Sequence, residues 1–156
     1  MSTTQVLAPV AGRAVPLQDV PDPVFSAGMV GYGAAVDPPR GVVDAVAPVT
    51  GRLLKLMPHA FIVMTPDNVG VLVHLGLDTV ALKGEGFTAH VSEGDDVIAG
   101  QVVITYDVPA IEVKGLNPIV PVVVMDERES GNVVPSEAVF EGANIASGAS
   151  LFVANK

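Results

Sequence analysis

The most reactive side chains of this sequence are three imidazoles, at His59, His74 and His90. The chain has no Cys, so thiol nucleophiles, disulfides and cysteine-ligated zinc are all excluded. The spacings His-x-His and His-x3-His, typical of metal ligands, are absent, and no serine stands in a Gly-x-Ser-x-Gly turn. We therefore expect no metal site, no cofactor, and chemistry based on imidazole, which can be neutral and nucleophilic near pH 7.

His74 lies in a segment whose alternation predicts a β-strand. Over residues 69–77 every odd position is Val or Leu, so these side chains share one face of the strand. His74 falls on the opposite face, with Leu72 and Gly76 as its neighbours there. The glycine would let another molecule approach the imidazole. An ordinary half-exposed strand histidine would give the same pattern, and periodicity alone does not separate the two readings.

The other two histidines have different surroundings. His59 comes just before a predicted strand at residues 61–64, and it would meet His74 if the two strands are neighbours, which the sequence alone does not show. His90 stands in Phe87-Thr88-Ala89-His90-Val91, and we interpret it as a surface residue.

The elements that must position these histidines are short strands. Apolar runs rich in Val and Ile, mostly bounded by Pro, Gly, Asp or Asn, predict one all-β domain, a sandwich or a barrel. The runs are residues 14–15, 41–46, 53–56, 61–64, 69–77 and 119–125. Residues 127–138 are a weak helix candidate, because Gly131 and Pro135 argue against a long helix. Gly31-Tyr32-Gly33 and Gly84-Glu85-Gly86 do not complete a phosphate loop, and we interpret both as tight turns.

Two phrases occur twice. Ala-Pro-Val-x-Gly-Arg stands at residues 8–13 and again at 47–52, and Glu-Gly followed by a second Gly and an apolar run stands at 93–104 and again at 141–153. Their order, with both copies of the first phrase before both copies of the second, suggests two similar halves interleaved in one sheet system. Chance similarity between glycine-rich turns is the alternative.

The charge balance limits the partners. Eight Lys and Arg stand against 17 Asp and Glu, a net charge of -9, so nucleic acid binding is disfavoured. No apolar run reaches the roughly 18 residues of a membrane span, and the N-terminus does not resemble an export signal. We therefore expect a cytoplasmic protein without direct membrane insertion.

Several blocks, in order, carry a family resemblance. Residues 59–61, 73–80 (Val-His-Leu-Gly-Leu-Asp-Thr-Val) and 82–87, preceded by 19–25 and 30–33, resemble the glucose-type enzyme IIA of the bacterial phosphoenolpyruvate-dependent sugar phosphotransferase system. The resemblance runs from about Val6 to Val153, nearly the whole chain.

The resemblance implies a phosphocarrier. We expect one enzyme IIA type-1 domain over residues 1–156, with residues 1–5 flexible, folded as an antiparallel β-sandwich with a duplicated hybrid motif and little helix. In this family the histidine matching His74 accepts a phosphoryl group on Nε2 from the carrier HPr. It then passes the group to the IIB domain of a membrane sugar permease of glucose or N-acetylglucosamine type. The histidine matching His59 supports the transfer.

The same resemblance suggests how partners dock on a monomer. Gly76 would let the donor approach, and Asp22 and Asp78 would face basic residues of HPr or IIB, although both could also be ordinary solvated carboxylates. A kinase or permease that the protein regulates is a further partner class. The apolar rim around the histidines is expected to consist of Val24, Phe25, Met29, Val30, Leu72 and Leu75.

Some positions depart from the family pattern. Asn68 stands where the family usually has Gly, and Asn tolerates a left-handed turn less freely. Ala27 replaces an acidic rim residue, which puts the regulatory interface in doubt. Two alternatives stay open: a purely regulatory binding protein that has lost phosphotransfer, and a zinc peptidase on a similar duplicated fold. The retained pair of histidines argues against the first, and the missing ligand spacings argue against the second.

Overall fold

The computed structural model describes residues 3–155, and most of them lie in β-strands or in the turns between them. The strands are β1 (Thr3–Leu7), β2 (Gly12–Pro16), β3 (Gly31–Asp37), β4 (Val42–Val46), β5 (Gly51–Met57), β6 (Ala60–Met64), β7 (Gly70–His74), β8 (Phe87–Ala89), β9 (Asp96–Val97), β10 (Val102–Asp107), β11 (Val120–Met125), β12 (Val133–Pro135), β13 (Asn144–Ile145) and β14 (Ser150–Asn155). The short helices are η1 (Leu17–Asp19), α1 (Pro23–Ser26), η2 (Thr79–Leu82), α2 (Val108–Val113), η3 (Ser130–Asn132) and α3 (Glu137–Glu141).

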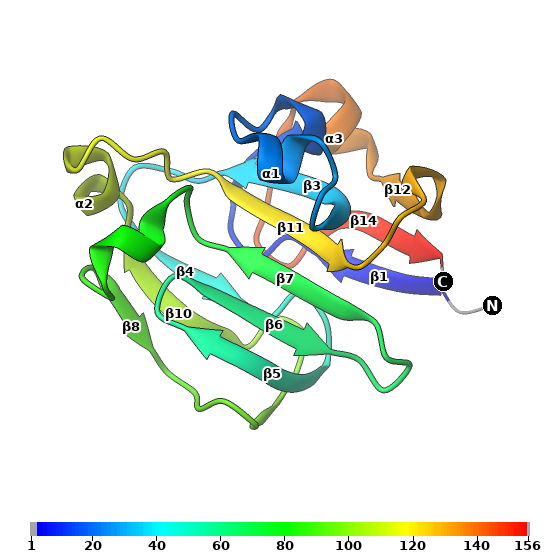
Figure 1. Cartoon of the computed structure of the whole chain (residues 1–156), viewed down its shortest axis with the longest axis horizontal. Helices are drawn as coiled ribbons and strands as arrows, with labels where there is room; N and C mark the ends of the chain where they lie inside the picture. Colours follow the sequence, from blue (N-terminus) through cyan, green and yellow to red (C-terminus); the bar gives the residue numbers. More distant parts are fainter. Residues whose placement is uncertain (1–2, 156) are drawn as a thin grey trace.

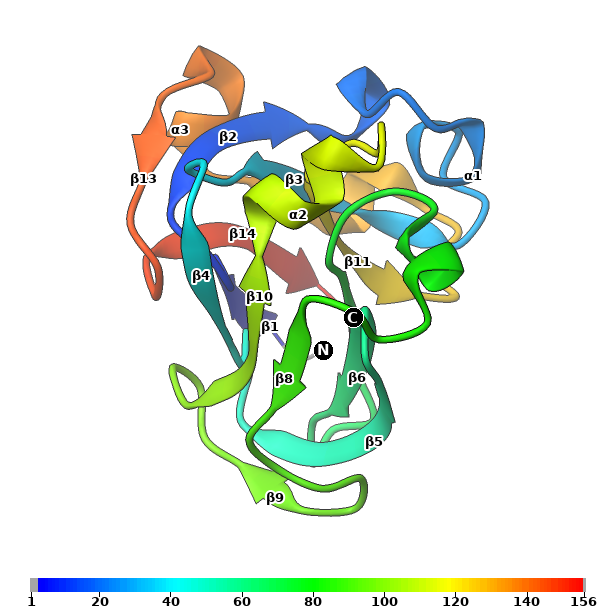
Figure 2. The same ribbon diagram turned by 90° about the vertical axis from the view of Figure 1, so that its left-hand side faces the viewer.

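The strands form three antiparallel sheets that curl around one another (Figures 1 and 2). The largest has eight strands in the order β13-β2-β3-β11-β7-β6-β5-β9, and the two smaller sheets have the orders β1-β14-β12 and β4-β10-β8. This all-β sandwich is the predicted fold class.

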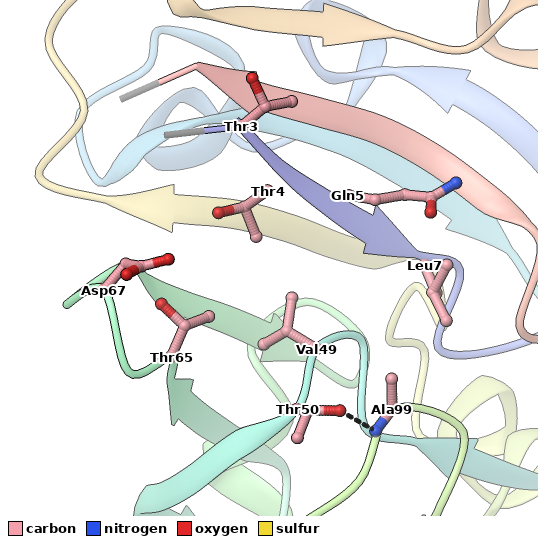
Figure 3. Close-up of a pocket in the computed structure, with 9 residues that line it drawn as sticks. All are labelled: Thr3, Thr4, Gln5, Leu7, Val49, Thr50, Thr65, Asp67 and Ala99. Atoms are coloured by element: carbon pink, nitrogen blue, oxygen red, sulfur yellow. Dashed lines mark hydrogen bonds between the residues drawn. The ribbon is translucent and has the colours of Figure 1, made fainter. Parts of the chain in front are cut away.

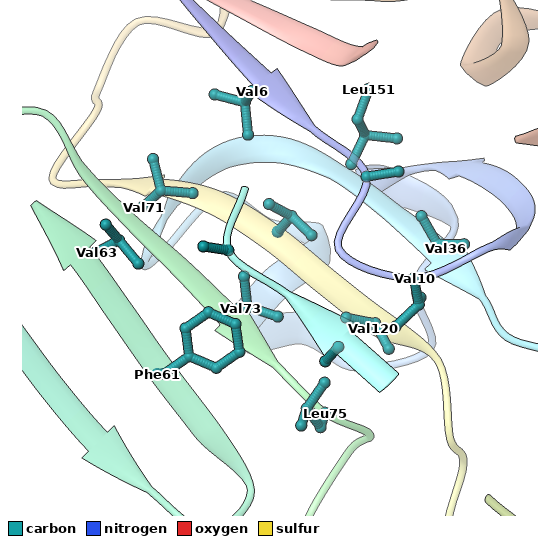
Figure 4. Close-up of a cluster of buried hydrophobic side chains, with 14 of the residues drawn as sticks. Val6, Val10, Val36, Phe61, Val63, Val71, Val73, Leu75, Val120 and Leu151 are labelled. Carbon is teal, nitrogen blue, oxygen red and sulfur yellow. The ribbon is translucent and has the colours of Figure 1, made fainter. Parts of the chain in front are cut away.

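One apolar core joins all three sheets. Val6 of β1, Phe61 of β6 and Leu151 of β14 are fully buried in it, as Figure 4 shows. Full burial of a side chain of this size contributes about 1.5–3 kcal/mol to the stability of the fold. Branched residues suit these positions, because they pack closely on a pleated surface.

The predicted duplication is visible in the backbone hydrogen bonds. Gly148 N donates to Ala8 O at 2.9 Å, and Gly100 N donates to Ala47 O at the same distance, so each copy of the first phrase pairs with one copy of the second. The residue before each copy of the first phrase also binds the other copy, since Leu7 N donates to Pro48 O and Val46 N donates to Pro9 O. The two halves are therefore interleaved, as the order of the phrases predicts.

A second, smaller apolar cluster covers the outer face of the eight-stranded sheet. The segment with η1 and α1 packs there through Leu17 and Phe25, against Leu72 of β7 and Val123 of β11. This segment lies directly beside the end of β7, so it forms one wall around His74.

The structure corrects three local expectations. Residues 127–138 are not one helix: they contain η3 and β12, and α3 begins only at Glu137, because Gly131 and Pro135 interrupt the helical pattern. Gly31-Tyr32-Gly33 is not a turn but the start of β3, and a Cβ on Gly33 would lie 1.9 Å from Val122 O, so glycine lets the two strands approach.

The third correction concerns the N-terminus. Thr3, Thr4 and Gln5, expected to be flexible, pair with Asn155, Ala154 and Val153 of β14. Their backbone groups are ordered by that ladder. Residues 1–2 lie outside the described residues, and the expectation stays a prediction there.

Candidate active site

His74 is the last residue of β7 and lies on the outer face of the eight-stranded sheet. Val71 and Val73 point into the main core, whereas Leu72 belongs to the outer cluster, so the alternation predicted for His74 is correct. The alternation ends there, and Leu77 packs in the outer cluster with Leu72 rather than on the inner face as expected. The cause is Gly76, whose φ of +90° turns the chain immediately after the strand.

His59 is brought to His74 by a hairpin. Pro58 and His59 form the two-residue loop between β5 and β6, and the register pairs Ala60 of β6 with His74 of β7. The two imidazole rings lie edge to face, with centroids 5.1 Å apart. The sequence left this contact open, and the antiparallel pairing of β6 with β7 settles it.

Phe25 also packs against His74. Its ring centroid lies 5.3 Å from that of the imidazole, and it is held there by α1. Asp22 starts this short helix, because its carboxylate accepts a hydrogen bond from Val24 N at 2.9 Å. Pro23 at the first helical position has the backbone conformation that a helix start needs.

A backbone carbonyl selects one tautomer of His74. His74 Nδ1 lies 2.5 Å from Gly76 O, and a carbonyl oxygen can only accept, so Nδ1 carries the proton. In the neutral ring the lone pair then resides on Nε2. The site thus presents Nε2 as its nucleophilic atom.

Both imidazoles are kept neutral by their surroundings. Burial lowers the pKa of His74 below its usual 6.5, and the Gly76 carbonyl and the carboxylates of Asp22 and Asp78 oppose this effect only in part. Burial likewise lowers the pKa of His59, helped by repulsion from a charged His74. At pH 7 the pair therefore consists of neutral rings.

The residues expected to form the apolar rim differ in their exposure. Val24 and Met29 are exposed, at 45% and 63%, and Val30 is partly exposed. Phe25 and Leu72 are almost fully buried, so they support the rim from beneath.

Leu75 is a correction. It is fully buried in the main core (Figure 4), where no partner can touch it, because it directly follows β7 and its side chain continues the inward-facing series of Val71 and Val73. Gly76 is buried too, while Asp78 is exposed and Asp22 partly exposed beside His74.

Two residues of this site escaped the sequence reasoning. Val80 in η2 is an apolar side chain that is 64% exposed, six residues after His74. Thr79 is fully buried, and its hydroxyl donates to Leu75 O at 2.9 Å. Their only signal was their place at the end of the block 73–80, which carries the family resemblance. Asn68, which stands where the family usually has Gly, adopts the left-handed conformation with a φ of +64°.

His90 stays apart from this pair. It is exposed on β8–β10, where Nε2 lies 2.7 Å from Thr105 Oγ1. A cavity of about 330 Å³ lined by Thr50, Thr65 and Asp67 contains no histidine (Figure 3). It lies beyond the end of β6 opposite to His59.

Residues 3–155 offer neither a metal-binding cluster nor a membrane-spanning helix. No group of three or more His, Asp or Glu side chains there could hold a metal ion. No helix in the same range is long and apolar enough to cross a membrane.

A β-sandwich that offers one neutral imidazole nitrogen beside a second histidine fits the class of histidine-dependent phosphotransferases. The family "phosphoenolpyruvate-dependent sugar phosphotransferase system, EIIA 1" matches residues 4–130, and the chain belongs to this family. Its members are phosphotransferases that act in a phosphohistidine relay.

Individual relatives agree with this assignment. A glucose-specific EIIA component of Oceanobacillus iheyensis is 43% identical over 137 residues, which cover 85% of this chain and 82% of the relative. A glucose-specific EIIBCA component of Corynebacterium glutamicum is 42% identical over 134 residues, 86% of this chain but 20% of the relative. The solved glucose permease IIA from Mycoplasma capricolum superposes with a TM-score of 0.85 at 30% identity, covering 98% of this chain and 96% of that one.

Proposed function

We propose that His74 accepts a phosphoryl group on Nε2 from phospho-HPr and passes it to the IIB domain of a sugar permease. The observation that carries the proposal is the contact between His74 Nδ1 and Gly76 O, because it fixes the proton on one nitrogen and the lone pair on the other. Burial, which lowers the pKa of the ring, keeps that lone pair available at neutral pH.

The transfer needs no net proton movement at His74. The Nε2 lone pair forms the new N–P bond while the N–P bond of the donor phosphohistidine breaks, and that electron pair returns to the donor ring. The hydrogen bond from Nδ1–H of His74 to Gly76 O is kept throughout, so the phosphorylated ring keeps its orientation. Transfer to IIB repeats the displacement with His74 as the leaving group. The protein mainly positions the reactants and stabilises the phosphoryl oxygens.

His59 supports transfer by donating to those oxygens. Its ring lies beside that of His74, 5.1 Å between centroids, so an N–H of His59 can reach a phosphoryl group on the neighbouring ring. The His59 ring is in place before the reaction, because the loop between β5 and β6 and the hydrogen bond from Leu75 N to His59 O at 2.7 Å hold the backbone of His59.

Partners dock on the surface formed by Val24, Met29, Val30 and Val80 around the histidines. Exposed apolar side chains around a buried reactive group exclude water, which would hydrolyse the phosphohistidine. Asp22 and Asp78 add negative charge for basic partners. The Corynebacterium relative, named EIIBCA, supports a IIB domain as acceptor.

The remaining parts of the proposal concern the protein in the cell. The chain acts as a single EIIA domain, as a monomer in the cytoplasm, and a kinase or permease that it regulates is a further partner. A sugar of glucose type is supported by the glucose-specific names of the relatives.

Phosphorylation by the purified relay tests the proposal. The chain is incubated with enzyme I, HPr and phosphoenolpyruvate, and the phosphoryl group is tested for acid lability and base stability. Wild type should gain one such group and His74→Ala none. A wild type that gains none, or a His74→Ala variant that still gains one, contradicts the proposal.

A further inference from the structure

We infer that Thr79 is a positioning residue for phosphoryl transfer: its buried side chain holds the turn whose carbonyl sets the tautomer of His74. The inference rests on the proposed function, since it assigns Thr79 a part in preparing Nε2. Thr79 touches neither the ring nor the phosphoryl group, and it acts through Leu75 and Gly76.

In two successive peptide groups of the turn, both the carbonyl oxygen and the N–H are hydrogen-bonded. The peptide between Leu75 and Gly76 accepts from Thr79 Oγ1 at 2.9 Å, and its N–H donates to His74 O at 3.1 Å. The peptide between Gly76 and Leu77 accepts from His74 Nδ1, and its N–H donates to Asn117 O at 2.8 Å. Thr79 and Asn117 therefore hold the planes on either side of Gly76.

The methyl group of Thr79 restricts the same turn sterically. A Cβ on Gly76 would lie 2.6 Å from Thr79 Cγ2 and 3.1 Å from Asn117 O, so the glycine backbone is enclosed between the two residues. Thr79 itself is fully buried, and so is Leu75, so no water replaces the hydroxyl if it is lost. A buried carbonyl without a donor would turn toward another partner and would rotate the adjoining peptide group.

The consequence for the chemistry is a choice between two ring nitrogens. While Gly76 O faces Nδ1, the proton stays there and Nε2 is the nucleophile. When Gly76 O moves away, the neutral ring has no reason to keep its proton on Nδ1, and the tautomer with Nε2 protonated and unreactive gains population. Thr79 thus determines how much of the protein is ready to react.

The test compares variants that separate the effect of the Thr79 hydroxyl from the effect of side-chain volume. Thr79→Val keeps the branched shape without the hydroxyl, Thr79→Ala removes the hydroxyl without placing a methyl against Leu75 O, and Thr79→Ser keeps the hydroxyl. Thr65→Val is the matched control. Thr65 is a buried threonine in the connection between β6 and β7, at the end of β7 opposite to His74, and it lines the cavity of Figure 3. Its hydroxyl accepts a hydrogen bond from Val69 N at 3.0 Å.

The first readout is the tautomer of His74 in the unphosphorylated protein, from the ¹⁵N shifts of the two ring nitrogens. The second is the initial rate of phosphorylation by phospho-HPr. We expect wild type, Thr79→Ser and Thr65→Val to show Nδ1–H, and Thr79→Val and Thr79→Ala to show a mixture. The rate should fall about tenfold in the last two variants and no more than about twofold in Thr79→Ser.

The inference is overturned if the hydroxyl-free variants keep the wild-type tautomer, or if Thr79→Ser loses as much rate as Thr79→Val. It is also overturned if Thr65→Val lowers the rate equally, because the effect would then be one of general stability. If Thr79→Val does not fold, Thr79→Ala decides. Failure of the proposed function looks different: wild type would then show the Nδ1–H tautomer and still gain no phosphoryl group on His74.

Discussion

His74 ends β7 and His90 directly follows β8, and each has one ring nitrogen held by a neighbour, yet the two sites differ in which nitrogen is held. His74 gives Nδ1 to the carbonyl of Gly76, at the end of the eight-stranded sheet. His90 gives Nε2 to the hydroxyl of Thr105, on the small sheet of β8 and β10. The free nitrogen is therefore Nε2 in the first and Nδ1 in the second.

The neighbours explain the difference. Thr105 Oγ1 already donates to Asp44 Oδ1 at 2.6 Å, so it accepts from His90 Nε2. His90 is also exposed, while His74 packs against the rings of Phe25 and His59. The reactivity of an imidazole nitrogen thus depends on the backbone carbonyl and the aromatic side chains around the ring, and not on the presence of a histidine alone.

The largest difference between the two regions should appear when each loses a histidine. We expect His59→Gln to accept phosphate from HPr but to pass it to IIB on the order of 100-fold more slowly, because the phosphoryl oxygens lose a donor. His90→Gln should transfer at the wild-type rate. Single-turnover transfer from the phosphorylated chain to IIB measures both. Full transfer by His59→Gln would remove its assigned role.

A smaller effect is expected from the turn after β7. Gly76→Ala places a Cβ against Thr79 and Asn117 at a φ of +90°, so the carbonyl that holds His74 must shift. The rate of phosphorylation should fall about tenfold to 100-fold.

Gly100→Ala is the control for this turn. Its φ is +94° but a Cβ there meets no atom within 4 Å, so only the backbone strain of about 1–2 kcal/mol remains. Its phosphorylation should be unchanged when the rate is measured below the melting temperature of both variants. Equal rates for the two variants would show that the position of the Gly76 carbonyl is unimportant.

A still smaller effect concerns the charges near His74. Asp78→Asn removes a carboxylate that acts on the ring, while Asn tolerates the left-handed conformation at φ +59°. Association with HPr should slow about twofold to fivefold at low salt and less at high salt. Asp67→Asn, exposed beyond the other end of β6, should leave association unchanged. An Asp78→Asn effect that is insensitive to salt would contradict electrostatic attraction.

The smallest effect is a pH dependence of stability. Burial lowers the pKa of His59 and His74 in the folded protein below 6.5, so the unfolded chain binds protons more readily. The free energy of unfolding should therefore be unaffected by these groups above about pH 6.5 and should fall as the pH drops below it.

Thermal melting between about pH 7.5 and about pH 5 measures this slope. The double variant His59→Gln, His74→Gln should lose part of it. The account of the buried pair is wrong if the double variant melts with the wild-type pH dependence.

Much of this arrangement could be predicted from the sequence, because it depends on local periodicity. Alternation placed His74 on the outer face correctly, and the repeated phrases revealed the interleaved halves. Prediction failed where the backbone leaves the strand, because Leu77 changes face after Gly76. The assignment of Leu75 to the rim was wrong for another reason: the alternation itself places Leu75 on the inner face, where it is buried.

Tertiary contacts explain what the sequence missed. The hydroxyl of Thr79 matters only because Leu75 O is buried beside it, and Asn117 O reaches Leu77 N from another part of the chain. The helices α1 and α2 are only four and six residues long, too short for a helical period to show. Each begins with an aspartate followed within two residues by proline, which is the signal that could have revealed it.

The central claim is that His74 carries the phosphoryl group on Nε2 while Nδ1 stays protonated. The chain labelled with ¹⁵N-histidine, phosphorylated by enzyme I, HPr and phosphoenolpyruvate, can be tested by the one-bond coupling between ³¹P and ¹⁵N. We predict that phosphorus couples to Nε2 of His74 and that Nδ1 of the same ring keeps its proton. Coupling to Nδ1 of His74, or to a nitrogen of His59 or His90, would contradict the account.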